Sequence, residues 1–199
     1  MTMTATLDET DGRHARRERN RLAVVDAMLA LYATGNLEPS SDQIAQRAGL
    51  SPRSLFRYFD DLDDLVRVAV ARHYERLLPL VDLDTTTAPL ADRVARLVDQ
   101  RLRLFEAIAS VGTVARLRAP FQPLIAAELA TARRYWREQI RKLFAAELRQ
   151  LGSPAAHVVA SIDVLTSFES VQLMRDDQQL SAPAIAAALV HSITALLTS

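Results

Sequence analysis

The side chains best suited to chemistry in this sequence lie in the short segment from Pro52 to Phe59. Placed at intervals of about 100°, Leu55, Phe56 and Phe59 fall on one side of a helix. The opposite arc of roughly 140° holds four polar side chains: Arg53, Ser54, Arg57 and Tyr58. An arginine fork pairs with the O6 and N7 atoms of guanine, while hydroxyls bind phosphates or base edges. The pattern predicts a helix that packs with one face and hydrogen-bonds a nucleic acid with the other.

A second group of candidates is the basic stretch near the N-terminus. Residues 13–21 contain five arginines and one glutamate, a local charge of +4, although the whole chain has a net charge of zero. Clustered arginines bind a phosphate backbone whatever the base sequence. The free amides at the start of a helix offer a further phosphate site. The residues we predict to contact the DNA backbone in these two ways are Arg16, Arg17, Arg19, Ser40 and Ser41.

Other chemistries find little support in the residue types. Aspartates at 60, 61, 63 and 64 suggest calcium, but a calcium loop starting at Asp61 needs glycine at its sixth place and glutamate at its twelfth. This chain has Val66 and Arg72 there, so capping of a helix start explains the acids better. The chain has no cysteine, no closely spaced histidine pair, no nucleophile elbow and no glycine-rich phosphate loop. We therefore expect neither an enzyme nor a bound metal or cofactor.

Four helices are predicted to position these candidates. Apolar residues recur at helical spacing from Leu22 to Tyr32, and Gly35 then suits a left-handed cap. Ser40 and Gln43 form a capping-box pattern that opens a short helix ending before Gly49. Ser51 caps a third helix, which we expect to run from Pro52 to about Phe59, and a fourth follows from Asp61 to about Leu80. Two short helices joined by a glycine turn have the dimensions of a helix-turn-helix.

The expected fold class is all-α, with an N-terminal three-helix helix-turn-helix domain and a C-terminal helical bundle for ligand binding and dimerisation. We expect a disordered tail at 1–12, an arm and helix-turn-helix domain at 13–81 with the motif at about 40–59, and a C-terminal domain at 82–199. Threonines and a proline between 82 and 89 suggest the boundary. The later helices are predicted over these ranges: 90–110, 113–118, 123–151, 155–174 and 183–197.

Nothing in the sequence predicts a membrane segment or a secretion signal. The start of the chain lacks an apolar stretch of the kind that signal peptides contain. The longest nearly continuous apolar segment, residues 184–197, is shorter than the roughly 18 residues needed to span a bilayer. We expect a cytoplasmic protein.

The segment from Arg21 to Val66 resembles the TetR family of bacterial repressors. The resemblance rests on the amphipathic first helix and on three single residues, Gly35, Ser40 and Leu65. It also rests on three runs: Ile44-Ala45, Ala48-Gly49-Leu50-Ser51 and Leu55-Phe56-Arg57-Tyr58-Phe59. It implies a homodimer that binds a palindromic DNA operator and is released by a small-molecule effector. Three residues depart from the family pattern, since Phe56 replaces a tyrosine, Tyr58 a common histidine and Leu62 a lysine. Whether Leu62 faces DNA or the core is left open by the sequence.

The last helix is predicted to form a dimer interface together with the helix that contains Ile162. Residues 184–197 are apolar nearly all round, and such a helix must be buried. A subunit interface explains this burial, although a purely intramolecular core is the alternative. The predicted interface residues are Ile162, Leu165, Phe168, Ile185, Leu189, Ile193 and Leu196.

An effector pocket is expected among the middle helices. Each candidate is also compatible with plain core packing, and the sequence does not identify the effector. The candidate lining residues are Phe105, Ile108, Leu117, Phe121, Tyr135, Trp136, Gln139, Phe144 and Phe168. A second reading of the whole chain is a helical interaction or ligand-binding protein whose helix-turn-helix no longer binds DNA.

Overall fold

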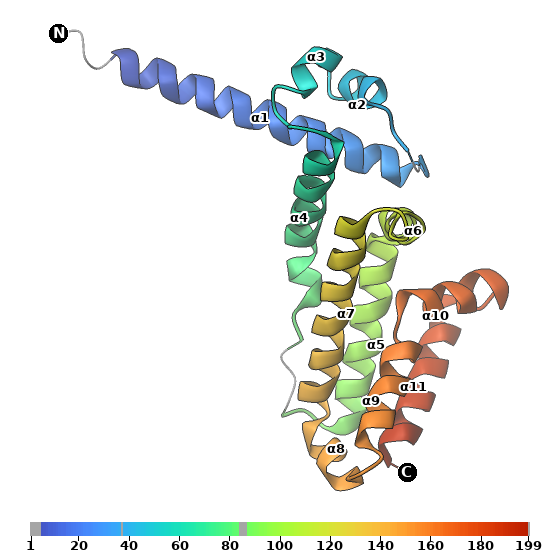
Figure 1. The fold of residues 1–199 in the computed structure, drawn as a ribbon. Coiled ribbons are helices and arrows are strands. Elements are labelled where there is room, and N and C mark those ends of the chain that lie inside the picture. Colours follow the sequence, from blue (N-terminus) through green and yellow to red (C-terminus); the bar gives the residue numbers. More distant parts are fainter. Residues whose placement is uncertain (1–4, 37, 84–86, 199) are drawn as a thin grey trace. The chain divides into compact units, whose positions relative to one another are not determined.

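The computed structural model describes residues 5–36, 38–83 and 87–198, and every regular element in these ranges is a helix (Figure 1). The predicted all-α class is therefore confirmed. The elements are α1 (Ala5–Ala33), α2 (Ser41–Arg47), α3 (Pro52–Leu55), α4 (Leu62–Val81), α5 (Leu90–Ala107), α6 (Ala109–Arg118), α7 (Pro123–Leu143), α8 (Ala145–Leu151), α9 (Ala155–Leu165), α10 (Phe168–Gln172), the π-helix η1 (Leu173–Asp177) and α11 (Ala182–Thr198).

The predicted disordered tail is wrong for residues 5–12, because α1 begins at Ala5 and continues without a break to Ala33. No proline interrupts this stretch, and the first turn contains residues that tolerate a helix. The first part of the predicted tail, residues 1–4, lies outside the described residues, as do residues 84–86 of the predicted boundary.

The chain divides into two compact units, one formed by Met1–Arg76 and Ser110–Glu128 and the other by Leu77–Ala109 and Leu129–Ser199. The predicted boundary at residue 82 differs from this division in two ways. The first unit ends inside α4, and it also includes α6. The Arg118 guanidinium at the end of α6 lies 5.9 Å from the centre of the Tyr32 ring in α1. The sequence does not predict this contact, because the two residues are far apart in the chain.

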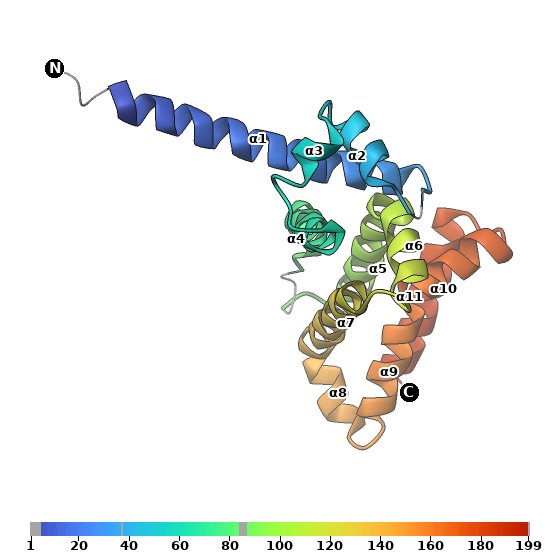
Figure 2. The same ribbon diagram turned by 45° about the horizontal axis from the view of Figure 1, so that its top comes forward.

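The first unit is organised around the second half of α1. In both ribbon views α2 and α3 lie against this half, while the N-terminal half extends beyond them (Figure 2). Fully buried side chains come from α1, α2, α3 and α4: Val24, Val25, Ile44, Ala45, Leu55 and Leu65. Asp26 of α1 ties α4 to this core, since its Oδ1 accepts hydrogen bonds from Arg72 Nε at 3.1 Å and from Arg76 Nη2 at 2.6 Å.

The second unit is a bundle in which α11 packs against α5 and α9. Its core contains Leu97, Leu104, Phe105, Ile140, Ile162, Leu189 and Ile193. Arg93, near the start of α5, closes one end of the bundle. Its guanidinium donates to Leu143 O at 2.6 Å and to both carboxylate oxygens of Glu147, at 2.5 and 3.0 Å. The start of α5 is thereby joined to the end of α7 and to α8.

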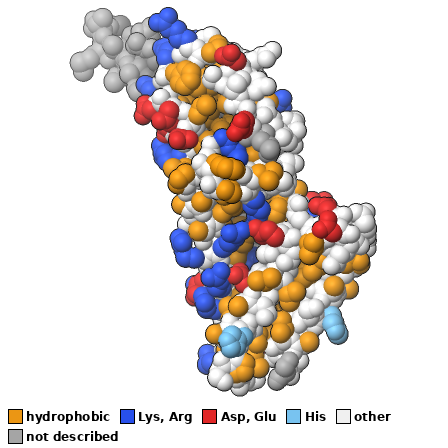
Figure 3. Space-filling view, turned by 45° about the vertical axis from the view of Figure 1, so that its right-hand side comes forward, with side chains coloured by type: hydrophobic (Ala, Val, Ile, Leu, Met, Phe, Trp, Pro, Cys, Tyr) orange, Lys and Arg blue, Asp and Glu red, His pale blue; other side chains and the backbone are white. Residues whose placement is uncertain are grey.

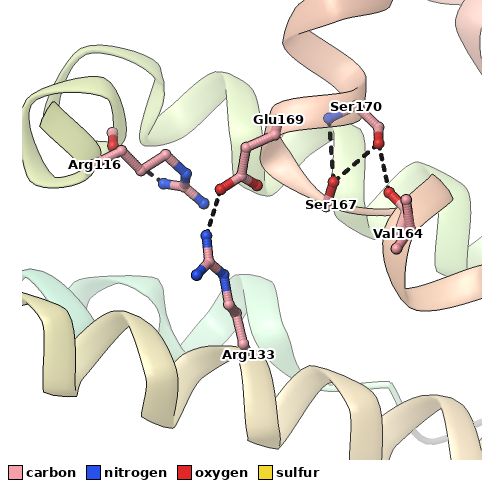
Figure 4. A network of polar contacts seen from close by, with 7 residues as sticks. Arg116, Arg133, Val164, Ser167, Glu169 and Ser170 are labelled. Atoms are coloured by element: carbon pink, nitrogen blue, oxygen red, sulfur yellow. Dashed lines mark hydrogen bonds and ion pairs between the residues drawn. The ribbon is translucent and has the colours of Figure 1, made fainter. Parts of the chain in front are cut away.

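Two helices predicted as continuous are interrupted. The predicted helix 123–151 breaks at Phe144 into α7 and α8, and the predicted helix 155–174 breaks after Leu165. At the second break Ser167 caps α10, because the backbone N–H of Ser170 donates to Ser167 Oγ at 3.1 Å (Figure 4). The Ser170 hydroxyl in turn donates to Val164 O at 2.5 Å. Local serine hydrogen bonds thus compete with the helical ones, which apolar periodicity does not reveal.

None of the helices in the described part of the chain is both long enough and apolar enough to cross a membrane.

Candidate DNA interface

The helix-turn-helix is built by the capping residues that the sequence predicts. Ser40 Oγ accepts from the backbone N–H of Gln43 at 3.3 Å, and Gln43 Oε1 accepts from the backbone N–H of Ser40 at 2.9 Å. This confirms the capping box at the start of α2. Gly49, between α2 and α3, has φ of +69°, a left-handed conformation that favours glycine. Ser51 caps α3 through the N–H of Ser54 at 3.3 Å, with Pro52 in the first turn.

The third helix is shorter than predicted, and this changes which of its side chains are exposed. α3 ends at Leu55, and the following residues form a turn in which the Tyr58 N–H donates to Leu55 O at 2.9 Å. Phe56 therefore leaves the packing face on which regular helical spacing places it, and 51% of its surface is exposed. Leu55 and Phe59 remain buried, as predicted. The surface of the motif thus carries an aromatic ring besides its polar groups.

The polar arc keeps its two arginines at the surface. Arg53 and Arg57 are both exposed, and no hydrogen bond or ion pair of their side chains is found in the described residues. Ser54 is half-buried and shares a hydrogen bond of 2.9 Å with the Ser51 hydroxyl. The two exposed guanidinium groups give this surface positive charge and donors for base edges, and the exposed Phe56 ring offers one apolar contact.

Tyr58 is anchored rather than freely exposed. Its hydroxyl oxygen accepts a hydrogen bond from Asn20 Nδ2 of α1 at 3.0 Å, and the side chain is half-buried. The hydroxyl keeps its own proton, which can be donated to a phosphate. The contact fixes the end of the motif against α1. Sequence spacing did not reveal Asn20, because the two residues are 38 positions apart.

Leu62, whose direction the sequence left open, lies at the surface with 39% of its area exposed. The neighbouring acids behave as capping groups, since Asp61 Oδ1 accepts from the Asp64 N–H at 2.7 Å and Asp64 pairs with Arg67. Over the described residues no set of three His, Asp or Glu side chains is placed to hold a metal ion. The start of α4 therefore presents an exposed leucine amid acids.

The predicted arm lies along α1. Arg16, Arg17 and Arg19 are all exposed on this helix. Arg21 differs from them, because its guanidinium lies 5.4 Å from the centre of the Phe59 ring and 3.8 Å from a Glu18 oxygen. Ser40 is exposed and Ser41 is half-buried at the start of α2. The structure thus separates one arginine that packs on the motif from three that remain available to a partner.

The predicted dimer residues are mostly buried inside the subunit, which corrects their assignment. Exposure is 2% or less for Ile162, Phe168, Ile185, Leu189 and Ile193. They belong to the core of the second unit, where α10 and α11 pack against α5 and α9 packs against α10 and α11, so the intramolecular alternative holds for them. Leu165 and Leu196 instead line an open hollow of about 740 Å³ on the outer face of α9 and α11. Its other lining residues are Ala160, Ser161, Val164, His191, Ser192 and Ala195.

The predicted effector residues also separate into groups. Phe105, Ile108, Phe144 and Phe168 are buried in the second unit, where the Phe105 ring meets Trp136 and Phe168 edge to face at centroid distances of 5.8 and 5.5 Å. Tyr135 and Gln139 line a recess in the same unit. Leu117 and Phe121 belong to the first unit, with 53% and 85% of their surfaces exposed, and are not part of that aromatic cluster. Their hydrophobic character alone could not distinguish surface from pocket.

The fold and the exposed arginine face define a class, that of helix-turn-helix proteins with a helical C-terminal body. Two solved structures share the fold, each with a TM-score of 0.68. A TetR-family transcriptional regulator from Streptomyces coelicolor is 22% identical, over 88% of this chain and 81% of its own. A TetR transcription regulator from Haloarcula marismortui is 17% identical, over 89% of this chain and 96% of its own.

At the level of sequence, the chain is 37% identical over 93 residues to the HTH-type transcriptional repressor KstR of Mycolicibacterium smegmatis. The match covers 46% of this chain and 43% of that repressor, so less than half of the relative's length is represented. No family model matches the chain. The predicted resemblance to the TetR family is confirmed by these likenesses in fold and sequence.

Proposed function

We propose that this protein is a DNA-binding transcriptional regulator, a repressor that leaves a palindromic operator when its helical body binds a small molecule. The observation that carries the proposal is the capped helix-turn-helix with Arg53 and Arg57 exposed and unpaired among the described residues. In such a motif the second helix enters the major groove of DNA. A regulator of this kind acts on chromosomal DNA, and hence in the cytoplasm.

Within this proposal the contacts divide by type. Arg53 and Arg57 read base edges, with Ser54 and Tyr58 at the rim of the reading surface. Arg16, Arg17 and Arg19 on the N-terminal half of α1 contribute contacts to phosphates or to the minor groove. Ser40 and Ser41 lie where the first amides of α2 are available to a phosphate. Base contacts give sequence preference, and backbone contacts give affinity and salt dependence.

The outer face of α9 and α11 supports the dimer in this proposal. Figure 3 shows hydrophobic side chains over the lower part of the molecule, with histidines and charged side chains beside them. Val164 is the most prominent, with 64% of its surface exposed. Alanines and serines around it let two helix pairs approach closely, and the hollow between α9 and α11 accepts side chains of a second copy. We propose that a homodimer forms on this face and sets the spacing of the two DNA half-sites.

The alternative function is a helical ligand-binding protein whose helix-turn-helix has lost DNA binding. The departures at Phe56 and Leu62 and the acids around Leu62 favour it, since they remove polar contacts and repel phosphate. The exposed arginine face argues for the regulator. The test is to select DNA from a random duplex library with the purified full-length protein and to measure the affinity for the enriched sequence. Enrichment of one inverted repeat is expected, whereas recovery of unchanged random sequence would establish the alternative.

A further inference from the structure

Arg101 of α5 is an unusual residue for the interior of a helical bundle. None of its surface is exposed. Its Nη1 atom donates to Gln100 Oε1 at 2.6 Å, and the guanidinium carbon lies 5.4 Å from the centre of the Trp136 ring. The two other nitrogen atoms, Nε and Nη2, have no acceptor among the described residues. A buried donor without a partner is costly, and a buried cation more so.

The charge of Arg101 is not neutralised by a paired carboxylate. Burial lowers the pKa of Arg101 to about 10, partly opposed by the charge of Asp163, so the group stays protonated at neutral pH. Asp163 is already engaged, because its Oδ2 accepts from Arg137 Nε at 2.9 Å. Replacing such an unpaired buried cation with an apolar residue often stabilises a protein. A cation kept in this position therefore points to a role other than stability.

The two free donors have the geometry of a carboxylate receptor. Nε and Nη2 lie on the same edge of the guanidinium plane, and their N–H bonds are spaced to meet both oxygens of one carboxylate. One flat face of the guanidinium lies over the Trp136 ring, and this ring also contacts Phe105. An anion with an aromatic body finds a charge partner and a ring surface at the same place.

Polar contacts connect Arg101 to a recess at the surface of the same unit. Gln100 Nε2 and Gln139 Nε2 both donate to Val81 O, at 2.6 and 2.9 Å, and the buried Gln139 Oε1 has no donor among the described residues. The recess holds about 190 Å³, and its lining residues are Asp82, Leu83, Tyr135, Glu138, Gln139, Lys142 and Leu143. Tyr135 is 51% exposed, so its ring can turn outward without disrupting core packing.

We propose that Arg101, Trp136 and Gln139 form the effector site, and that the effector is a small aromatic carboxylate. Its carboxylate accepts from Nε and Nη2 of Arg101, its ring packs on Trp136, and Gln139 Oε1 accepts from any donor group it carries. Asp82 and Glu138 at the rim of the recess are exposed and screened by water, and they oppose Lys142, so they weigh less than the buried cation. The inference rests on the proposed function, because it assigns the ligand class of the regulator's body.

The single tryptophan of the chain makes the site directly observable. Trp136 emission of the full-length protein is titrated with phenylacetate and with phenylacetamide, which has nearly the same shape without the charge. We expect a saturable change with phenylacetate and at least about tenfold weaker binding of the amide. Arg101→Met should abolish the preference for the acid. Arg103→Met, which removes an arginine that is 64% exposed on the same helix, should leave the preference unchanged.

Equal affinity for acid and amide, no saturable response to either, or an unchanged preference in Arg101→Met would overturn the proposal. If Arg101→Met does not fold, Arg101→Lys keeps the charge but loses the two-pronged edge, and should reduce the preference by a smaller factor. Each protein is also tested on its selected DNA by fluorescence anisotropy. Failure of DNA selection with an intact preference for the acid would reject the regulator. Successful DNA selection without a preference for the acid would reject only the carboxylate site.

Discussion

At the scale of single residues, the early end of α3 determines the chemistry of the recognition surface. The helix stops at Leu55, and Phe56 is exposed, as are Arg53 and Arg57. Phe56 cannot donate a hydrogen bond, but its ring can contact the methyl group of thymine. The surface therefore combines guanidinium donors with one apolar contact, and the two kinds of contact favour different base pairs.

Replacing Arg53 with alanine should weaken specific DNA binding by about 1–3 kcal/mol, because a two-pronged contact to one base is lost. Preference should relax at one base pair in each half-site and remain at the others. Repeating the DNA selection with Arg53→Ala measures both effects. Arg141→Ala removes an exposed arginine of the second unit and serves as the control. An unchanged preference would remove Arg53 from the reading surface.

Leu62 allows a matched pair of substitutions. Because Leu62 is exposed amid aspartates, Leu62→Lys should tighten binding to specific and non-specific DNA alike and steepen the salt dependence by about one phosphate contact. Its melting temperature should be unchanged. Leu65→Lys, on the same helix but fully buried, should lower the melting temperature. Salt titrations and thermal melts decide this, and a destabilised Leu62→Lys without tighter binding contradicts the surface assignment.

At the scale of elements, buried arginines decide how the helices of the second unit are held. Arg93 uses its whole guanidinium, with Ala88 O, Leu143 O and Glu147 as acceptors, and so joins three segments. Arg101 has one acceptor, the side chain of its neighbour Gln100 in α5, and so does not join separate segments. The first arrangement is what a structural buried arginine requires, since each of its three nitrogen atoms has an acceptor. The contrast is one reason for assigning Arg101 to a ligand.

Removing the charge of Glu147 should destabilise the bundle. The hydrogen bond from Arg93 lowers the pKa of Glu147, against the opposing effect of burial, so the ionised form stabilises the folded state. Glu147→Gln should cost about 2 kcal/mol at neutral pH. A depressed carboxyl pKa gives stability that is present above the unfolded pKa and lost as pH falls through the folded one. The difference between the two proteins should therefore shrink as the pH drops below about 4.5.

Denaturant unfolding at several pH values measures this difference. Asp99→Asn is a suitable control, because the Asp99 pair with Arg103 is exposed and of the i,i+4 kind, and such pairs contribute little. A loss for Glu147→Gln that is no larger than for Asp99→Asn, or that does not change with pH, would show that the buried pair does not stabilise the bundle.

At the scale of the whole molecule, the two faces of α9 and α11 should respond differently to a charge. Val164 lies on the outer face and Ile193 on the inner one, with 64% and 0% exposure. Val164→Arg should leave each subunit folded but convert the dimer to a monomer, and so weaken operator binding. Ile193→Arg should unfold the subunit, because the charge has no partner in the core.

Sedimentation velocity and circular dichroism of both variants separate these outcomes. Leu117→Arg changes a leucine that is 53% exposed in the first unit, and should affect neither property. A folded and dimeric Val164→Arg variant would place the subunit interface elsewhere on the molecule.

The sequence by itself determined the helical class, the capping of α2 and α3, and the exposure of the two arginines of the polar arc, Arg53 and Arg57. These features depend on short-range interactions, such as those between Ser40 and Gln43 or between Ser51 and Ser54, and near neighbours in the chain reveal them. Serine side chains that bond to the backbone can also end a helix, and the hydrogen bond between Ser167 and Ser170 makes the predicted helix 155–174 too long.

Only the tertiary structure decided which apolar residues are core and which are surface. Ile193 and Val164 have equally hydrophobic side chains, but α11 turns one toward α5 while α9 leaves the other uncovered. The same holds for Arg101, which has the sequence signature of an ordinary surface arginine on an amphipathic helix and is fully buried. Burial depends on what other segments bring to a side chain, and Trp136, which contacts Arg101, comes from a distant part of the chain.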